Sequence, residues 1–150
     1  MRVVIQRVRK ASVLINATEK RVISQGLVVL LGIEMSDTEE DVLWMVNKTL
    51  NLRIFGDEND VMNRSLLDIE GELLVVSQFT LMASTKKGNR PSYIRAATHE
   101  HAIPLYESFL AVARERMEQA VVSGTFGAAM QIDLVNDGPV TIVIDSKNKE

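Results

Sequence analysis

The sequence predicts a single α/β domain in which layers of mixed, barrel-like β-sheet pack against two main helices. The first observation is the length of 150 residues, which is typical of one compact domain. The second is the hydrophobic pattern, in which two segments have helical spacing and about six or seven are typical of strands. No repeat or linker divides the chain. We therefore expect one domain over residues 1–145, followed by a polar tail over 146–150.

The N-terminal fifth of the chain has the pattern of β-structure. Apolar residues alternate from Val3 and Ile5 onward to Ile15, which predicts one long strand. The run from Leu27 to Leu31 is apolar at every position, so this strand should be covered on both faces.

A first helix is predicted after Thr38. The residues 36–38 are good capping residues, and acids occupy 39–41, where the helix dipole favours them. Helical spacing of apolar residues continues from Val42 to Leu50. The helix should end near Arg53, because turn formers fill 55–60, and irregular structure is expected from there to Glu70.

The second half should contain a central strand over Glu72–Leu81, a polar loop over 84–92 and a second helix that runs to Ala120. Two starts remain open for this helix, because Thr98 is a plausible cap but Pro104 cannot donate a helical hydrogen bond. The helix begins near 102 or is disturbed there. Strands at 130–135 and 140–144, separated by a turn, should precede a frayed tail from 146.

Composition excludes several kinds of chemistry. The absence of cysteine excludes disulfides, thiolate nucleophiles and Cys-ligated zinc. His99 and His101 lack metal-ligand spacing and a third ligand, which favours surface histidines at a helix N-terminus and no metal. No phosphate-binding or dinucleotide fingerprint is present, so we expect no cofactor. The longest apolar run, 26–33, is too short to span a bilayer, and the charged start fits no signal peptide, so a cytoplasmic protein without membrane contact is expected.

The charge distribution is uneven. The formal net charge of −3 argues against a protein that coats nucleic acid. However, residues 1–18 and 73–99 each carry four cations and no acid. These segments either form a local phosphate-binding patch, if folding brings them together, or are ordinary solvated faces.

Two short polar segments lie beside strands and are the candidate sites. Residues 77–81 end an apolar strand with an amide and two hydroxyls, which either serve function or satisfy the neighbouring backbone. Residues 136–141 have the pattern of a turn, in which Gly138 offers a positive φ and Pro139 fixes φ before the last strand.

Together these segments resemble the D-aminoacyl-tRNA deacylase family along almost the whole chain. The two signatures are Ser77-Gln78-Phe79-Thr80 and the segment from Asn136 to Thr141. Further matching segments are Ile5–Val8, Ala11–Val13, Leu30–Ile33, Arg53–Phe55, Met62–Asn63, Gly88–Ser92 and Gly124–Ala128. Tyr93 stands where the family often has Phe, and it keeps the ring.

The resemblance implies a homodimer with active sites at the subunit interface, which hydrolyses the ester between a D-amino acid and the 3′-terminal adenosine of tRNA. Mischarged glycyl-tRNA should also be a substrate. The catalytic segment would be Ser77, Gln78, Phe79 and Thr80. Gly138-Pro139 would be a cis dipeptide that enters the active site of the other subunit and collides with L side chains.

The resemblance also gives roles to basic and polar residues. Arg7 would bond carbonyls beside the dipeptide and hold it in place, with Asn136 as a second supporting residue. Lys86, Lys87 and Arg90 are candidates for contacts with tRNA phosphates.

Two mechanisms remain open. Either the hydroxyl of Thr80 attacks the ester, or the ribose 2′-OH activates or positions water while backbone N–H groups of Phe79 and Thr80 stabilise the oxyanion. We favour the second, because neither motif contains a base except Asp137, which a turn should face outward. A different class of function, motivated by the two acid-free segments, is a non-catalytic RNA-binding module.

Overall fold

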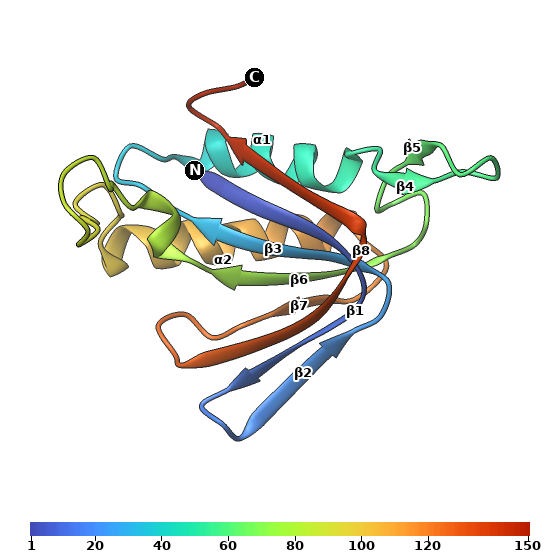
Figure 1. The fold of residues 1–150 in the computed structure, drawn as a ribbon, viewed down its shortest axis with the longest axis horizontal. Helices are drawn as coiled ribbons and strands as arrows, with labels where there is room; N and C mark the ends of the chain where they lie inside the picture. Colours follow the sequence, from blue (N-terminus) through green and yellow to red (C-terminus); the bar gives the residue numbers. More distant parts are fainter.

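The computed structural model describes residues 1–150 and contains a curled sheet with two helices on one side (Figure 1). In chain order the elements are β1 (Arg2–Ile15), β2 (Glu19–Ile23), β3 (Gly26–Gly32), α1 (Glu39–Asn51), β4 (Phe55–Gly56), β5 (Met62–Arg64), β6 (Glu72–Ser77), the 3-10 helix η1 (Phe79–Met82), α2 (His99–Arg116), β7 (Val121–Ser123) and β8 (Met130–Asp145). The predicted fold class, a single mixed α/β domain with two main helices and a barrel-like sheet, is confirmed.

The long strand β1 organises the sheet. Its first half pairs antiparallel with β3, its second half with β2, and β8 runs antiparallel along nearly its whole length. β6 and β7 then add parallel to β3, which gives the order β2-β1-β3-β6-β7 with β8 on β1. The β1–β8 register shifts on both sides of Val8, where the two strands bend. This bend folds the lower part of the sheet over the rest (Figure 1).

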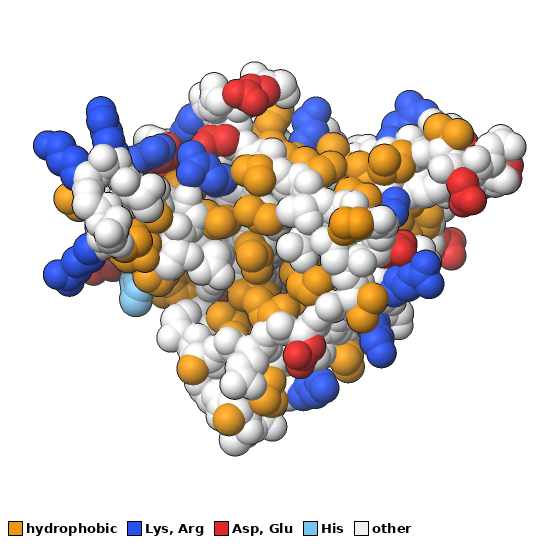
Figure 2. Space-filling view, viewed as in Figure 1, with side chains coloured by type: hydrophobic (Ala, Val, Ile, Leu, Met, Phe, Trp, Pro, Cys, Tyr) orange, Lys and Arg blue, Asp and Glu red, His pale blue; other side chains and the backbone are white.

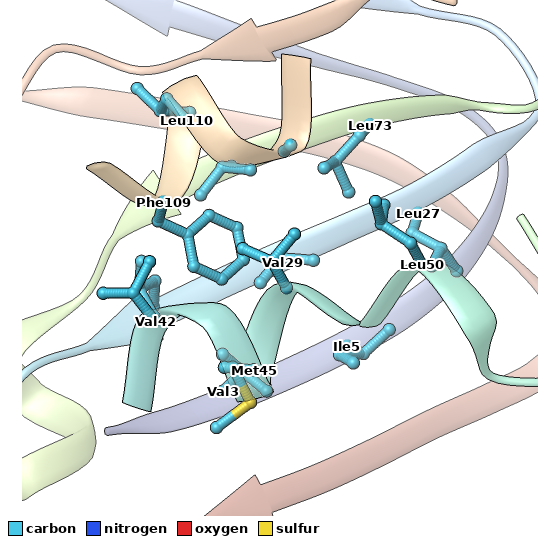
Figure 3. Close-up of a cluster of buried hydrophobic side chains, with 14 of the residues drawn as sticks. Val3, Ile5, Leu27, Val29, Val42, Met45, Leu50, Leu73, Phe109 and Leu110 are labelled. Atoms are coloured by element: carbon cyan, nitrogen blue, oxygen red, sulfur yellow. The ribbon is translucent and has the colours of Figure 1, made fainter. Parts of the chain in front are cut away.

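Two hydrophobic clusters fill the two faces of the sheet. The larger one lies between the sheet and both helices, where the Phe109 ring of α2 lies next to Val29 of β3 and α1 contributes Val42, Met45 and Leu50 (Figure 3). The smaller one lies inside the curl and includes Val28, the neighbour of Val29 in β3. Because successive strand residues point to opposite faces, β3 is covered on both sides, as its continuous apolar run predicts.

The helices differ from the prediction mainly at their ends. α1 begins after Thr38, whose hydroxyl and backbone join a capping box with Asp41, and it ends at Asn51, close to the predicted end. α2 begins at His99 with Thr98 as its N-cap and continues through Pro104. Burial of Tyr106 and the residues that follow compensates for the one hydrogen bond that proline removes. α2 ends at Arg116, and the strand β7, which was not predicted, follows.

Two strand predictions were wrong. The strand expected over 72–81 ends at Ser77 and gives way to η1. The turn expected at 136–139 is instead part of β8, which continues as one strand from Met130 to Asp145 because β1 pairs with it on both sides of this segment. The alternation of β8 is interrupted there, which is why the sequence has the pattern of two strands.

The expectation of a frayed tail was also wrong at its start. Ser146 is buried and its hydroxyl donates to Asp41 Oδ1 at 2.6 Å, while Lys147 Nζ lies 2.7 Å from Asp41 Oδ2. The chain therefore ends against α1 (Figure 1). No helix of the structure has the length and apolar character needed to cross a membrane.

Candidate active site

The first candidate segment lies where β6 ends. Four buried apolar residues of β6 precede the half-buried Ser77, and the backbone N–H of Gln78 still donates to Leu31 O of β3 at 2.8 Å. The chain then turns into η1, which packs against Gly32. A Cβ atom on Gly32 would lie 3.0 Å from Gln78 O and 2.9 Å from Leu81 Cβ, so glycine permits this close approach.

The start of η1 leaves backbone donors available. Phe79 and Thr80 are its first residues, and the first N–H groups of a helix have no acceptor within the helix. Neither N–H donates to any hydrogen bond in the turns, loops or caps of the chain. The site therefore has two neighbouring N–H groups that can face a ligand.

A pocket of about 480 Å³ opens beside this segment. Eleven of its fifteen lining residues are hydrophobic, and they come from the end of β3 and the residue after it, from β6, η1, the loop before α2 and the start of α2, and from the loop before β8 and the first half of β8. Ser77, Gln78 and Phe79 line it, whereas Thr80 does not. The walls that sequence reasoning missed are Ala102, Phe126, Ala128, Met130 and Ile132. Phe126 and Ala128 lie in a segment that matches the family, but the match gave them no role. The apolar alternation from Met130 to Ile132 was a second signal, but it indicates burial as readily as a pocket.

His99 is the only ionisable side chain that lines the pocket. It lies exposed at the start of α2, as predicted, and its ring meets the Phe126 ring edge-on with 5.6 Å between centroids. His101 lies elsewhere and has Nε2 3.0 Å from Asp37 O. No group of three or more His, Asp or Glu side chains is arranged to hold a metal ion.

Thr80 lacks a proton acceptor. Its hydroxyl receives a hydrogen bond from the Gln78 side-chain amide, and no other side chain bonds to it. An amide N–H donates and cannot take a proton, so this contact orients the hydroxyl without activating it as a nucleophile.

The second candidate segment is held by Arg7. Its Nε donates to Asp137 O at 3.0 Å and its Nη1 to Ile54 O at 2.5 Å. Asn136 spans the same segment, because its Oδ1 accepts from Val140 N at 3.0 Å. The Gly138-Pro139 peptide bond is cis, and Gly138 has φ of 121°. Asp137 does not face free solvent as expected, because its carboxylate pairs with the exposed Arg9 at 2.9 Å and lies 3.6 Å from Arg7 Nε.

The structure does not bring the two segments together within one chain. Pairing places the segment between Asn136 and Thr141 level with Glu72–Leu74 of β6, with β1 and β3 in between. With about 3.3 Å per residue and about 4.8 Å per strand, Gly138 lies on the order of 20 Å from Ser77. Neither Gly138 nor Pro139 lines the pocket.

The predicted phosphate contacts lie on the loop after η1. Lys86, Lys87 and Arg90 are exposed and form no salt bridge or side-chain hydrogen bond. Arg95, at the end of the same acid-free segment, instead pairs with Glu34 at 2.8 Å. Three of the four cations of this segment are therefore free to meet an anion.

The fold and site define an α/β protein with an apolar ligand pocket, unpaired backbone donors at its edge and no paired nucleophile and base. Residues 4–145 match the family model of D-Tyr-tRNA(Tyr) deacylase. Proteins named D-aminoacyl-tRNA deacylase from Azobacteroides pseudotrichonymphae and Flavobacterium johnsoniae are 64% and 56% identical, each over 100% of both chains. The chain belongs to the D-Tyr-tRNA(Tyr) deacylase family, and it is a hydrolase.

Two solved structures share this fold. The one described as c-Myc DNA Unwinding Element Binding Protein is 42% identical, with a TM-score of 0.91 over 97% of this chain and 98% of that chain. A probable eukaryotic D-amino acid tRNA deacylase is 21% identical, with a TM-score of 0.81 over 95% and 97%, and shares the fold.

Proposed function

We propose that this protein hydrolyses the ester of D-aminoacyl-tRNA, and of mischarged glycyl-tRNA, at the pocket beside Ser77–Thr80. D-aminoacyl-tRNA deacylase activity is supported by the family and by relatives of that name over the full chain. The observation that carries the location is the apolar pocket with two free backbone N–H groups at its edge. We assign the enzyme to the cytoplasm on the basis of this proposed substrate, and the proposed chemistry requires no cofactor.

The pocket suits the terminal adenosine. Its apolar walls include the Phe126 ring, which can contact the face of a base, and they include Phe79, whose backbone N–H is one of the two free donors. The ester carbonyl then lies near the N–H groups of Phe79 and Thr80, which stabilise the negative charge that develops on its oxygen.

Water is the nucleophile in this proposal. The ribose 2′-OH is adjacent to the ester and activates or positions the water, while the protein orients the substrate. The hydrogen bond from Gln78 to Thr80, and the absence of a base bonded to that hydroxyl, support this route over attack by Thr80.

Chiral selection is assigned to Gly138-Pro139 from a second copy of the chain. The distance between the two segments in one chain supports this arrangement, because a wall about 20 Å away cannot exclude a side chain. β8 also has one edge without a partner strand and exposes Val143 at 64% and Val135 at 43%. Figure 2 shows hydrophobic side chains across the face of the molecule that includes β8. We infer a homodimer with composite sites, in which only hydrogen or a D side chain avoids the Gly-Pro backbone.

Chirality-resolved deacylation tests the activity. We expect release of D-tyrosine from charged tRNA to be much faster than release of L-tyrosine, and glycine to be released as well. Equal release of both enantiomers would contradict the proposal. Tight, salt-sensitive tRNA binding without deacylation in single-turnover conditions would favour the RNA-binding module instead.

Mixed dimers test the composite site. Here D-specific activity means the rate with D-tyrosyl-tRNA minus the rate with L-tyrosyl-tRNA. Ala128→Phe should block the pocket and so stop hydrolysis, and Gly138→Ala should disturb the selecting segment and so remove the preference for D. Each homodimer therefore loses D-specific activity. Random reassembly of the two variants gives dimers with one intact site, and about a quarter of the wild-type D-specific activity should return. If each site belongs to one chain, the mixture stays without D-specific activity.

A further inference from the structure

Two aromatic rings lie exposed next to the pocket. Phe79 of η1 and Tyr93 of the following loop meet edge-on, with 5.1 Å between ring centroids and 70° between ring planes. Phe79 is 57% exposed and Tyr93 38% exposed, and the neighbouring Ile94 is 91% exposed. An edge-on pair leaves a ring face of each residue open to a further planar group.

Free positive charge flanks this pair. Ser84 and Ser92 exchange two backbone hydrogen bonds of 2.8 and 2.9 Å, which close the loop that carries Lys86, Lys87 and Arg90. No acid occurs from residue 73 to residue 99, and these three cations have no partner in the chain. Figure 2 shows cationic side chains projecting from this end of the molecule, beside hydrophobic ones.

We propose that the Phe79–Tyr93 pair is a stacking platform for the base of the nucleotide that precedes the terminal adenosine, with the loop cations along its phosphates. Exposed aromatic rings beside unpaired cations are the features that bind single-stranded nucleic acid without sequence readout. A purely apolar protein partner would not use three unneutralised cations around the rings. The inference rests on the proposed function, because Phe79 borders the pocket assigned to the adenosine and the preceding nucleotide must leave that pocket past its edge.

Substrates of two lengths test the platform. We would measure kcat/KM for D-tyrosyl esters of adenosine alone and of the cytidylyl-cytidylyl-adenosine trinucleotide. Stacking on an aromatic side chain is worth about 1 to 3 kcal/mol per base, or about 5- to 150-fold. Tyr93→Ala should therefore lower the ratio of trinucleotide to adenosine kcat/KM by at least about fivefold, mainly through KM, and Tyr93→Phe should restore it. Met62→Ala, on β5 and 57% exposed, is the control and should leave the ratio unchanged.

Binding of the uncharged trinucleotide provides a readout that is independent of hydrolysis. Calorimetric affinity should fall by at least about fivefold in Tyr93→Ala and recover in Tyr93→Phe. An unchanged ratio and affinity in Tyr93→Ala, or equal losses for both esters, would overturn the platform. If wild-type protein hydrolyses neither these esters nor D-tyrosyl-tRNA, the proposed function fails, and the affinities alone decide whether the aromatic pair binds a base.

Discussion

The Gln78 side chain donates a hydrogen bond to the hydroxyl of Thr80, so this hydroxyl, on one of the two residues with free backbone donors, is oriented by an amide and not by a base. Thr80→Val keeps the shape of the side chain and removes the hydroxyl. We expect kcat to stay within about threefold, whereas loss of a true nucleophile or base costs on the order of 100-fold or more. Single-turnover deacylation of D-tyrosyl-tRNA measures this.

Removing the ribose 2′-OH of the substrate should have a large effect, in contrast to removing the Thr80 hydroxyl. A tRNA that ends in 2′-deoxyadenosine should lose about 100-fold or more in the same assay, because the group that activates or positions water is absent. A strong loss of deacylation activity in Thr80→Val, together with full hydrolysis of the 2′-deoxyadenosine substrate by the wild-type protein, would establish threonine nucleophilic catalysis.

Arg7 and Arg9 both contact Asp137 but should differ in function. Arg7 is 14% exposed at its side chain and bonds the carbonyls of Asp137 and Ile54, whereas Arg9 is 75% exposed and pairs with the Asp137 carboxylate. Arg7→Met frees the backbone that precedes Gly138, and misplacement by about 1 Å can cost about 100-fold in a positioned site. We expect the ratio of D- to L-tyrosyl-tRNA hydrolysis to fall at least about tenfold.

Arg9→Met is the control for this change. An exposed ion pair contributes little, so the same ratio should stay within about twofold of wild type. Equal effects of the two substitutions would show that charge near Asp137 matters and that the carbonyl contacts of Arg7 do not.

Gly138→Ala should destabilise the fold through Arg7. A Cβ atom there would lie 2.6 Å from Arg7 Nη2 and 3.1 Å from Val140 Cγ2, at a φ of 121° that L residues rarely adopt. Gly88→Ala is the matched control, because Gly88 has φ of 66° with open space around it. In urea denaturation we expect Gly138→Ala to lower the free energy of unfolding by about 1 kcal/mol or more beyond the decrease caused by Gly88→Ala.

A double variant isolates the contact. If the clash with the guanidinium causes the excess destabilisation, the double variant should lose less free energy of unfolding than the sum of the losses in Gly138→Ala and Arg7→Met. Strict additivity would assign the loss to φ and to the contact with Val140.

Sequence patterns predicted the elements that repeat a simple period. β3 and α1 lie close to their predicted bounds, because each has a long and uniform apolar pattern. η1 was missed because the apolar residues Phe79 and Leu81 extend the apolar pattern of β6, while the packing against Gly32 ends the strand. Pairing over long sequence separations decides such cases, and a local pattern does not contain that information.

The candidate site was predictable only in part. Ser77–Thr80 stood out because polar residues end an apolar strand, and Arg7 was given its contact with the Gly138 segment by family resemblance. The wall formed by Phe126, Met130 and Ile132 has the composition of ordinary core, and only the curl of the sheet turns it toward the pocket. The fold of one chain keeps the two polar segments apart, and no local sequence pattern contains that separation.

Asp41 should make stability depend on pH. Burial tends to raise the pKa of its carboxyl, but hydrogen bonds from Lys147, Ser146 and the Thr38 backbone outweigh burial and hold the pKa well below the ordinary value. The folded protein therefore binds a proton at Asp41 less readily than the unfolded chain does. The stabilisation is present above the unfolded pKa of about 4 and is lost as pH falls below it toward the folded pKa.

Asp41→Asn removes the charge and keeps the size of the side chain. At pH 7 we expect it to lower the free energy of unfolding by about 1 to 3 kcal/mol, because charge-assisted bonds to Lys147 and Ser146 weaken. The gap between wild type and variant should narrow when urea denaturation is repeated at about pH 3, since the wild-type protein has by then lost part of this stabilisation. Lys147→Met should also lower stability at pH 7 and converge with wild type in acid. A gap that stays constant from pH 7 to about pH 3 would show that the folded pKa of Asp41 is not lowered by these contacts.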